Sequence, residues 1–489
     1  MNALARPQQG EARPEKGTAS MVDDSGVVTV YPSPAGEVLS EACELTVAGR
    51  RVPVHACRVS AIPFNQVWPG YQRPLEQTEL AAYASWDASG QADVQVLWHR
   101  PVQSVAVRPA SRGIVPLVDG QRIRFRLPGP GPVVVEVNGW HHALHLFAAP
   151  PAPDPPGPDG PGVRFFGPGV HDVGQLTLGS GETLYLAGGA VVYGSVHAHG
   201  ATDLRIVGRG VLDSSKQPRS RGSGSIRLTE CQNVTIDGVT LRDPPAWCLS
   251  LFGGTGVRIA NVKLIGLWRY NADGIDICNS QDVVVRDSFI RSFDDSIALK
   301  GMPGHADRPV RNVVVERCVI WNDWGRALEI GAETCAPEIA SVVFRDIDIV
   351  RTSWIAMDIQ HGDNATVHDV TFEDIDFEVD EVNLRPLIQQ GPDHQFEPDP
   401  GFCPRLLVIE IRPTGWTQGT ERGRVREVVF RAIRVRGVPR PASHLVGFDR
   451  AHDVSGVRLE DLSFNGRRVR TLAEAGVQIG PHVAGVVLQ

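Results

Sequence analysis

Three aspartates in two short segments are the residues of this sequence best suited to acid–base chemistry. Asp273 lies in an Asn-Ala-Asp-Gly-Ile-Asp segment at 271–276, and Asp294 and Asp295 lie in a Phe-Asp-Asp-Ser-Ile-Ala-Leu-Lys segment at 293–300. If the fold brings these segments together, the carboxyl groups repel one another and at least one pKa is raised. A protonated acid beside an ionised carboxylate can cleave a glycosidic bond, because the acid protonates the leaving oxygen while the carboxylate activates water.

An internal repeat beyond residue 163 indicates how the two segments are positioned. Its nine-residue core reads (Asn/Asp/x)-Val-x-(Ile/Val/Phe)-x-x-(Val/Ile)-x-(Leu/Ile/Phe). Copies begin at Asp203, Asn233, Gly256, Asp282, Asn312, Ser341, Asp369, Glu427 and Gly456. Each copy alternates apolar residues, contains a turn and has no amphipathic helix, so it buries its apolar side only by stacking on its neighbours. The repeat predicts a parallel β-helix. The interval from Asp369 to Glu427 is either two coils or one coil with a long excursion around 384–423.

A second strand in each coil sets the register around the aspartates. We expect inward-facing pairs at Ile226/Leu228, Leu249/Leu251, Ile275/Ile277, Ile297/Leu299, Leu328/Ile330 and Met357/Ile359. Stacked strands lie about 4.8 Å apart, so equivalent positions form columns. The turn column, two positions before each pair, reads Gly224, Trp247, Asp273, Asp295, Arg326, Ile355. The middle column, between the two members, reads Arg227, Ser250, Asp276, Ala298, Glu329, Asp358. The last column, after each pair, reads Thr229, Phe252, Cys278, Lys300, Gly331, Gln360.

These columns give a candidate site in which Asp273, Asp294 and Asp295 carry the catalysis. The expected substrate-binding residues are Asn271, Trp247, Lys300, Arg326, Glu329, Asp358, Gln360, Trp324 and Asp276. Aromatic rings stack on the C–H faces of sugars, which favours a role for the tryptophans. A turn-capping or calcium-binding aspartate cluster, packing tryptophans and a salt bridge from Arg326 to Glu329 or Asp323 are the alternatives. The eight cysteines contain no C-x-x-C pair, so no metal site or cofactor is predicted.

The N-terminal part of the chain has a different pattern. Short segments of period-2 alternation occur at 44–47, 51–55, 92–97, 102–107, 122–127 and 133–137. Such segments between turn residues predict an antiparallel β-sandwich. Residues 148–162 are rich in Pro and Gly and predict a stiff linker. The expected organisation is a disordered lead at 1–25, a β-sandwich domain at 26–147, the linker at 148–162 and a parallel β-helix catalytic domain at 163–489.

Composition excludes several classes of partner. The net charge of −8 argues against a nucleic acid or an anionic membrane surface. The chain contains no run of 18 apolar residues and its first residues lack the apolar region of a signal peptide. We therefore expect a cytoplasmic protein, or a secreted one if a signal sequence was removed. The expected partner is a carbohydrate, and the sequence leaves the number of subunits open.

The two aspartate segments resemble a known clan. Asn271, Asp273 and Gly274, followed one coil later by Asp294, Asp295 and Lys300, are similar to the signature of glycoside hydrolase families 28 and 49, which contain the polygalacturonases and dextranases. The resemblance implies a right-handed parallel β-helix and an inverting hydrolase without a cofactor. It also implies that Asp294 is the general acid and that Asp273 and Asp295 activate water.

Departures from the family pattern bear on the substrate. Where polygalacturonases carry Gly-His-Gly, this chain has Gly-Arg-Ala at 325–327. Where they carry the uronate-binding Arg-Ile-Lys, it has Asp-Ile-Gln at 358–360. An acidic groove disfavours a uronate carboxylate. The N-terminal sandwich, the coil at 165–192 and the Trp-Asn-Asp segment at 321–323 are instead closer to the dextranases and isopullulanase.

The expected activity is therefore inverting hydrolysis of a neutral, α-linked oligo- or polysaccharide, such as a dextran-like glucan. Three alternatives stay open from the sequence: a polygalacturonase-type pectin hydrolase, a uronate lyase or epimerase, and a non-catalytic glycan-binding β-helix.

Overall fold

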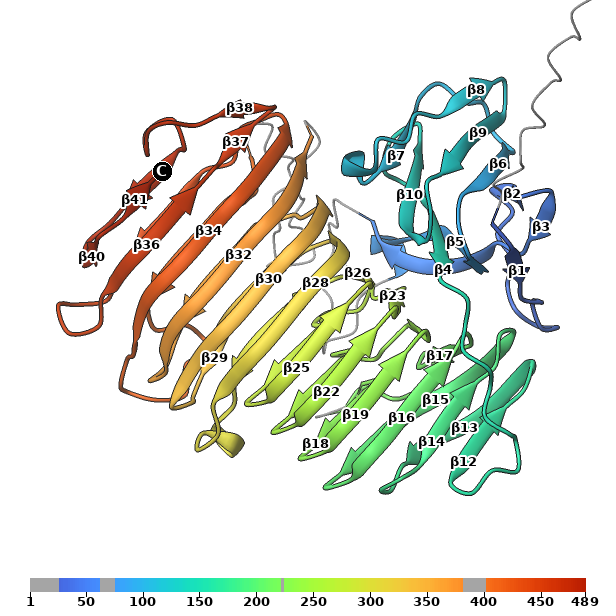
Figure 1. Cartoon of the computed structure of the whole chain (residues 1–489), viewed down its shortest axis with the longest axis horizontal. Helices are drawn as coiled ribbons and strands as arrows, with labels where there is room; N and C mark the ends of the chain where they lie inside the picture. The colour runs from blue at the N-terminus through green and yellow to red at the C-terminus, as the bar shows by residue number, and fades with distance from the viewer. Residues whose placement is uncertain (1–25, 62–74, 221–223, 381–401) are drawn as a thin grey trace, which may run out of the picture.

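A computed structural model describes residues 26–61, 75–220, 224–380 and 402–489. The chain forms a β-sandwich followed by a right-handed parallel β-helix, which confirms the predicted all-β fold class. The β-helix runs from β12 (Val163–Phe166) to β41 (Val487–Leu488), and the sandwich lies against its flank near β23 (Lys263–Ile265) and β26 (Phe289–Ser292) (Figure 1).

The sandwich consists of two sheets. The six-stranded sheet contains β1 (Val28–Val30), β4 (His55–Ser60), β5 (Thr78–Ala88), β7 (Val105–Arg108), β10 (Gly131–Val137) and β11 (Leu144–Ala149). The five-stranded sheet contains β2 (Cys43–Val47), β3 (Arg50–Val52), β6 (Ala92–Trp98), β8 (Leu117–Asp119) and β9 (Arg122–Leu127). The strand pairings of the two sheets are antiparallel, except that β5 and β11 pair in parallel.

Two central strands, β5 and β11, carry no alternating pattern and are absent from the sequence-based prediction. Every residue of β11 is buried, as are most residues of β5. These strands face the second sheet on one side and the β-helix on the other, as Tyr83 and Phe147 show by packing against Phe289 and Trp321. A strand buried on both faces loses its period-2 signal.

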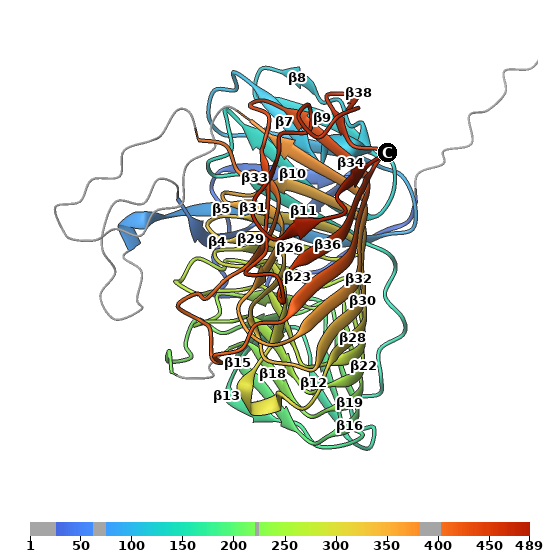
Figure 2. The same cartoon turned by 90° about the vertical axis from the view of Figure 1, so that its left-hand side faces the viewer.

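The β-helix has three ladders of stacked strands. The first contains β12, β14 (Thr183–Leu186), β16 (Thr202–Gly208), β19 (Gln232–Asp237), β22 (Thr255–Ala260), β25 (Gln281–Arg286), β28 (Val310–Asn322), β30 (Glu338–Arg351), β32 (Thr366–Val379), β34 (Arg424–Gly437) and β36 (Val454–Glu460). The second contains β13 (Gly169–Thr177), β15 (Ala190–His199), β17 (Val211–Asp213), β20 (Thr240–Arg242), β23, β26 and the second halves of β28, β30, β32 and β34. The third contains β18 (Ile226–Thr229), β21 (Leu249–Phe252), β24 (Ile275–Cys278), β27 (Ile297–Gly301), β29 (Arg326–Thr334), β31 (Ile355–His361), β33 (Arg405–Ile411), β35 (Ser443–Val446) and β39 (Val477–Ile479). Figure 2 shows the coils stacked along the helix.

The repeat corresponds to the first ladder, and its register is as predicted. The valines at its second position, from Val234 to Val457, are partners in successive strands. The first residue of all nine copies has a positive φ between 50° and 69°. Asn, Asp and Gly tolerate this left-handed conformation best, which explains their recurrence there. Because β32 pairs directly with β34, the long interval is one coil with an excursion.

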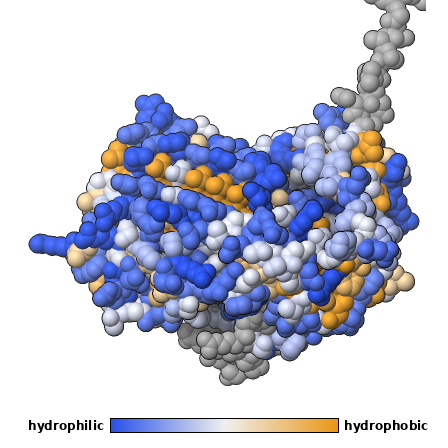
Figure 3. Space-filling view, turned by 60° about the horizontal axis from the view of Figure 1, so that its bottom comes forward, coloured by the Kyte–Doolittle hydropathy of each residue, from blue (hydrophilic) through white to orange (hydrophobic). Residues whose placement is uncertain are grey.

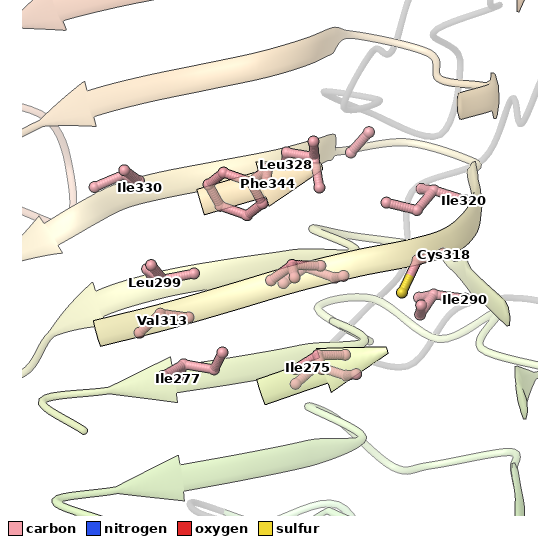
Figure 4. Close-up of a cluster of buried hydrophobic side chains, with 14 of the residues drawn as sticks. Ile275, Ile277, Ile290, Leu299, Val313, Cys318, Ile320, Leu328, Ile330 and Phe344 are labelled. Carbon is pink, nitrogen blue, oxygen red and sulfur yellow. The ribbon is translucent and has the colours of Figure 1, made fainter. Parts of the chain in front are cut away.

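The third ladder has the inward pairs that the sequence predicts. Leu249, Ile275 and Ile297 are consecutive partners, as are Ile277 and Leu299, and all are fully buried. These side chains fill the interior of the coils together with residues of the other ladders (Figure 4). The residues between and after them therefore point away from the core, which places the middle and last columns on one side of the β-helix.

Buried ion pairs join the sandwich to the β-helix. Arg242 of β20 donates to Glu37 at 2.8 and 2.9 Å and to the Tyr83 hydroxyl at 2.9 Å, and it also pairs with Asp213. Arg209 donates to Asp87 of β5 at 2.8 Å. The guanidinium of Arg242 helps to lower the pKa of Glu37 to about 2 in spite of burial. The two parts are thus coupled electrostatically as well as by apolar packing.

One face of the molecule is mostly hydrophilic (Figure 3). The space-filling view shows apolar residues confined to a few bands on a largely polar face (Figure 3). Within the described ranges, no helix is both long and apolar enough to cross a membrane.

Replacing Arg242 tests the strength of this junction. Arg242→Met leaves the buried carboxylate of Asp213 without a cation and leaves Glu37 with His55 alone, 3.7 Å away, so we expect a loss of about 3–5 kcal/mol in unfolding free energy. The matched control Arg126→Met breaks an exposed pair with Asp93 and should cost less than about 1 kcal/mol. Urea unfolding followed by tryptophan fluorescence measures both variants. Equal stability of the two variants would show that the junction does not depend on Arg242.

Candidate active site

The predicted turn column exists, and backbone hydrogen bonds fix it. The amide of Cys248 donates to the Asp273 carbonyl at 2.9 Å, that of Gly274 to the Asp295 carbonyl at 2.8 Å, and that of Ser296 to the Arg326 carbonyl at 2.8 Å. A Cβ on Gly274 would lie 2.3 Å from the Ser296 carbonyl oxygen, so only glycine allows this close approach. The adjacent coils therefore bring Asp273, Asp295 and Arg326 side by side.

Lys300 binds two aspartates from the preceding coil. Its Nζ lies 2.9 Å from Asp273 Oδ2 and 3.0 Å from Asp276 Oδ1, and the three side chains are at most 4% exposed. Asn271 donates to the other oxygen of Asp273 at 3.2 Å. Burial raises the pKa of Asp276 to about 6 and that of Asp273 well above its usual range, because one ammonium cannot compensate both carboxylates.

Arg326 is the cation that binds Asp295, as Lys300 binds Asp273 and Asp276. The Arg326 backbone N–H and Nη1 lie 3.2 and 3.5 Å from Asp295 Oδ1, and Lys300 Nζ lies 4.0 Å from Oδ2. Burial alone would raise the pKa of Asp295. Arg326, a hydrogen bond from Glu329 and Lys300 outweigh burial, so the pKa of Asp295 falls below its ordinary value. Asp295 is thus the ionised carboxylate of the cluster.

Asp294 lies in the opposite environment. Burial and the neighbouring Asp295 carboxylate raise the pKa of Asp294 to about 7, although Arg326 and Lys300 oppose the shift. Its Oδ1 accepts the Asp295 N–H at 3.2 Å, and no other described residue donates to its side chain. Adjacent residues in the chain therefore provide a protonated acid and an ionised base near neutral pH.

The three predicted substrate-binding acids of the middle column are buried. Asp276 and Glu329 are 0% exposed and lie beneath the groove, whereas Asp358, 1% exposed, lines a pocket beside Arg326. Arg326 Nε is 3.3 Å from Asp358 and 3.8 Å from Glu329. Burial raises the pKa of Glu329 strongly and that of Asp358 to about 7. Neutral Glu329 keeps its proton and donates a hydrogen bond to the Asp295 carboxylate.

The last column departs from the prediction at one point. Cys278 pairs with Lys300 as expected, but a β-bulge follows in β29. Leu299 pairs with Ile330, whereas Gly301 already pairs with Thr334, so Lys300 has no register partner at Gly331. Gln360 does pair with Gly331, and its Oε1 accepts a hydrogen bond from Arg326 Nη2 at 3.3 Å.

The aromatic residues divide between groove and core. Trp247 lies with its ring 4.1 Å from Lys300 Nζ, and Trp354 lies 4.4 Å from the Arg326 guanidinium, so both tryptophans adjoin the charged cluster. Trp324, predicted to bind substrate, instead belongs to the main core and stacks on Phe293 with ring centroids 5.5 Å apart. Sequence spacing does not distinguish the two cases, because all three residues adjoin turns.

A pocket of about 310 Å³ adjoins Arg326 on the side of the following coils. Its lining includes Trp354 and Gln360, together with Arg405 and Glu410 of β33 and Arg412 directly after this strand. Arg412 Nε lies 2.7 Å from Glu410, and Arg405 lies 4.0 Å from it. The sequence analysis missed these three residues because β33 follows the long excursion and lacks an aligned repeat. The apolar Leu-Leu-Val-Ile-Glu-Ile run at 406–411 is the signal that could have revealed this strand.

Within the part of the chain that the structure describes, no cluster of three His, Cys, Asp or Glu residues has the geometry of a metal site. In the candidate site, the amino group of Lys300 and the guanidinium of Arg326 lie between the carboxyl groups.

Comparison with known proteins agrees with this geometry. Residues 196–390, which include all the predicted site residues, match the family described as "Glycosyl hydrolases family 28". The expected likeness to the family 28 and 49 glycoside hydrolases is confirmed. Relatives include "Probable rhamnogalacturonase A" of Aspergillus oryzae, 25% identical over 152 residues, and "Rhamnogalacturonase A" of Aspergillus aculeatus, 23% identical over 152 residues.

The two alignments cover 31% of this chain and 30% and 32% of the relatives, so the chain matches about a third of their length. Among solved structures, Dex49A from Penicillium minioluteum has a TM-score of 0.64 at 15% identity and covers 94% of this chain and 96% of its own. This likeness extends over nearly the whole chain and shows the shared fold.

Substitution of Glu329 tests its protonation. Glu329→Gln keeps a donor for Asp295 and should change the unfolding free energy at pH 7 by less than about 1 kcal/mol. Glu329→Leu removes a hydrogen bond to a buried carboxylate and should cost about 1.5–3 kcal/mol. Chemical unfolding measures both. An ionised Glu329 would instead make the Gln variant as unstable as the Leu variant.

Proposed function

We propose that this protein is an inverting glycoside hydrolase that cleaves a neutral, α-linked oligo- or polysaccharide. The observation that carries the proposal is the opposite electrostatic environment of Asp294 and Asp295, which keeps one protonated and the other ionised. The family 28 match over these residues supports it. General acid–base hydrolysis of a glycoside requires such a pair.

Asp294 is the proposed general acid, because burial and Asp295 favour its protonated form and one of its carboxyl oxygens accepts no hydrogen bond from a described residue. Its proton would pass to the glycosidic oxygen as the bond to the anomeric carbon breaks. Asp295, the ionised carboxylate, would accept a proton from the attacking water on the opposite face of the sugar, and Asp273 would help to position that water. Lys300 and Arg326 hold these two carboxyl groups in place, and both cations favour the ionised form of Asp295.

The neutral substrate is supported by the absence of the Arg-Ile-Lys triplet in the third ladder and by the tryptophans beside the cluster. Trp247 and Trp354 offer apolar rings to sugar C–H faces. Asp358 and Gln360 occupy the positions at which the family places its cationic residues.

One observation favours a second candidate, the hydrolysis of an acidic pectic glycan. Arg405 and Arg412 line the pocket beside Arg326, with Glu410 as the neighbouring acid. Two half-exposed guanidinium groups could bind a uronate carboxylate. The relatives that match part of this chain are named rhamnogalacturonases, which also supports an acidic glycan.

Asparagine substitution tests the acid. Asp294→Asn cannot donate the proton and should lower kcat about 10²- to 10⁴-fold while the fold persists. Asp282→Asn, at an exposed left-handed position of the repeat, is the matched control and should keep full activity. Initial rates and circular dichroism of both variants provide the measurement. An active Asp294→Asn enzyme would refute the assignment.

The pH dependence of kcat/KM tests the same pair of carboxyl groups. Asp294 with a pKa of about 7 donates its proton only below that pH, so kcat/KM should fall about tenfold per pH unit above about 7. The pKa of Asp295 is lowered, so the base should stay ionised down to about pH 3.9, the ordinary value. A basic limb that begins near pH 5 would contradict the assignment of Asp294.

A substrate panel decides between the two glycan classes. Isomalto-, nigero-, fructo-, arabino- and galacto-oligosaccharides represent neutral substrates, and polygalacturonate and rhamnogalacturonan represent acidic ones. Thin-layer chromatography detects the products, and proton NMR of freshly released sugar should show the inverted anomer. Activity confined to the acidic glycans would replace the neutral proposal with the pectic one. Rising absorbance at 235 nm, typical of an unsaturated uronate, would identify a lyase.

A further inference from the structure

A second cavity lies away from the candidate active site, between the sandwich and the second ladder. Its volume is about 920 Å³. Phe147 of β11 and the prolines at 150 and 151 form part of the wall on the sandwich side. Phe289 and Lys263 form part of the wall on the β-helix side. A cavity of this size accommodates a molecule as large as a disaccharide.

Lys263 is an unusual residue for this position. It pairs in register with Thr240 and Phe289, and all three belong to the outward-facing row of the second ladder. Its side chain is 4% exposed, and its one hydrogen bond runs from Nζ to the Gly238 carbonyl at 3.1 Å. No carboxylate of the described residues lies within ion-pair distance of its Nζ. A buried ammonium without a counter-ion is unfavourable.

The charged groups nearest to Lys263 already have partners, and on later coils the cavity wall also contains Asp346, Asp348, Asp374 and Asp376. Arg209 lies 2.8 Å from Asp87 and 3.7 Å from Asp237, and Arg286 pairs with Asp287 at 3.2 Å. Burial and the repulsion of Arg209 lower the pKa of Lys263 to about 7, while Asp87 and Asp237 act in the opposite direction. The amine is therefore the one described lysine whose charge lacks compensation, since Lys216 and Lys300 both pair with aspartates.

We propose that this cavity binds a small organic anion and that Lys263 pairs with its carboxylate or phosphate group. An oxyanion at Nζ supplies the missing counter-ion and accepts the two N–H groups that the Gly238 carbonyl leaves unused. The apolar wall of Phe147 and Phe289 receives the rest of the ligand. Above pH 7, binding takes one proton from solvent, because the neutral amine becomes an ammonium ion when the anion enters.

Calorimetric titration tests the site on the full chain, with inorganic phosphate, D-glucuronate and neutral D-glucose as probes. At pH 8, in two buffers of different ionisation enthalpy, one of the two anions should bind with uptake of nearly one proton, and glucose should not. Lys263→Met should weaken that binding about 10- to 100-fold and abolish the uptake. Lys263→Arg, permanently charged, should bind the anion without proton uptake.

Each outcome has a defined meaning. Binding of phosphate alone identifies a phosphorylated ligand, and binding of glucuronate identifies a sugar acid. Equal affinity in Lys263→Met, or no anion binding up to about 10 mM, overturns the proposal. If the methionine variant fails to fold, unchanged proton uptake in Lys263→Arg overturns it instead. Asp294→Asn should bind the anion as the unsubstituted protein does, which separates this cavity from the active site.

Discussion

Hydrogen bonding between successive coils is the constraint on which the candidate active site depends. Parallel strands lie about 4.8 Å apart, so residues more than twenty positions apart in sequence become neighbours. The bond from the Gly274 amide to the Asp295 carbonyl places Asp273 beside Asp295. Because glycine alone allows this approach, the Asp-Gly dipeptide is a requirement of stacking as much as of chemistry. The inward leucines and isoleucines of the third ladder then hold the turn column at the surface.

Stacking of the coils brings together more carboxyl groups than the site can hold in their ionised form. The cluster contains six carboxyl groups but two cations, Lys300 and Arg326, and all of it is largely buried. The carboxyl groups are those of Asp273, Asp276, Asp294, Asp295, Glu329 and Asp358. Several must therefore hold their protons at neutral pH, and the cations decide which do not. Arg326 favours ionisation of Asp295, which in turn keeps its neighbour Asp294 protonated. The proposed roles of Asp294 as acid and Asp295 as base both follow because the cluster has fewer cations than carboxyl groups.

The sequence predicts the ladders, the core and the catalytic column because each rests on a local period. Alternation reveals the strands, and a left-handed Asn, Asp or Gly marks each coil. Prediction fails where the period is interrupted. The bulge in β29 shifts the partners of Lys300, and the excursion before β33 conceals Arg405 and Arg412. Burial depth is also absent from the pattern, so Glu329 and Trp324 were expected in the groove and lie beneath it.

The sandwich contacts, through buried residues, the turn that carries the proposed acid Asp294. Burial lowers the pKa of His145 of β11 to about 3, so this residue is neutral. Its Nε2 lies 3.3 Å from Arg291 Nη1, and Arg291 Nε lies 3.1 Å from Asp323 Oδ2. The adjacent Asn322 donates to the Asp294 carbonyl at 2.7 Å. A continuous series of buried contacts thus runs from the sandwich to the turn that carries Asp294. Burial is the largest cause of the raised pKa of Asp294. A β-helix without the sandwich would admit water behind this turn, and the pKa of Asp294 would fall toward its ordinary value.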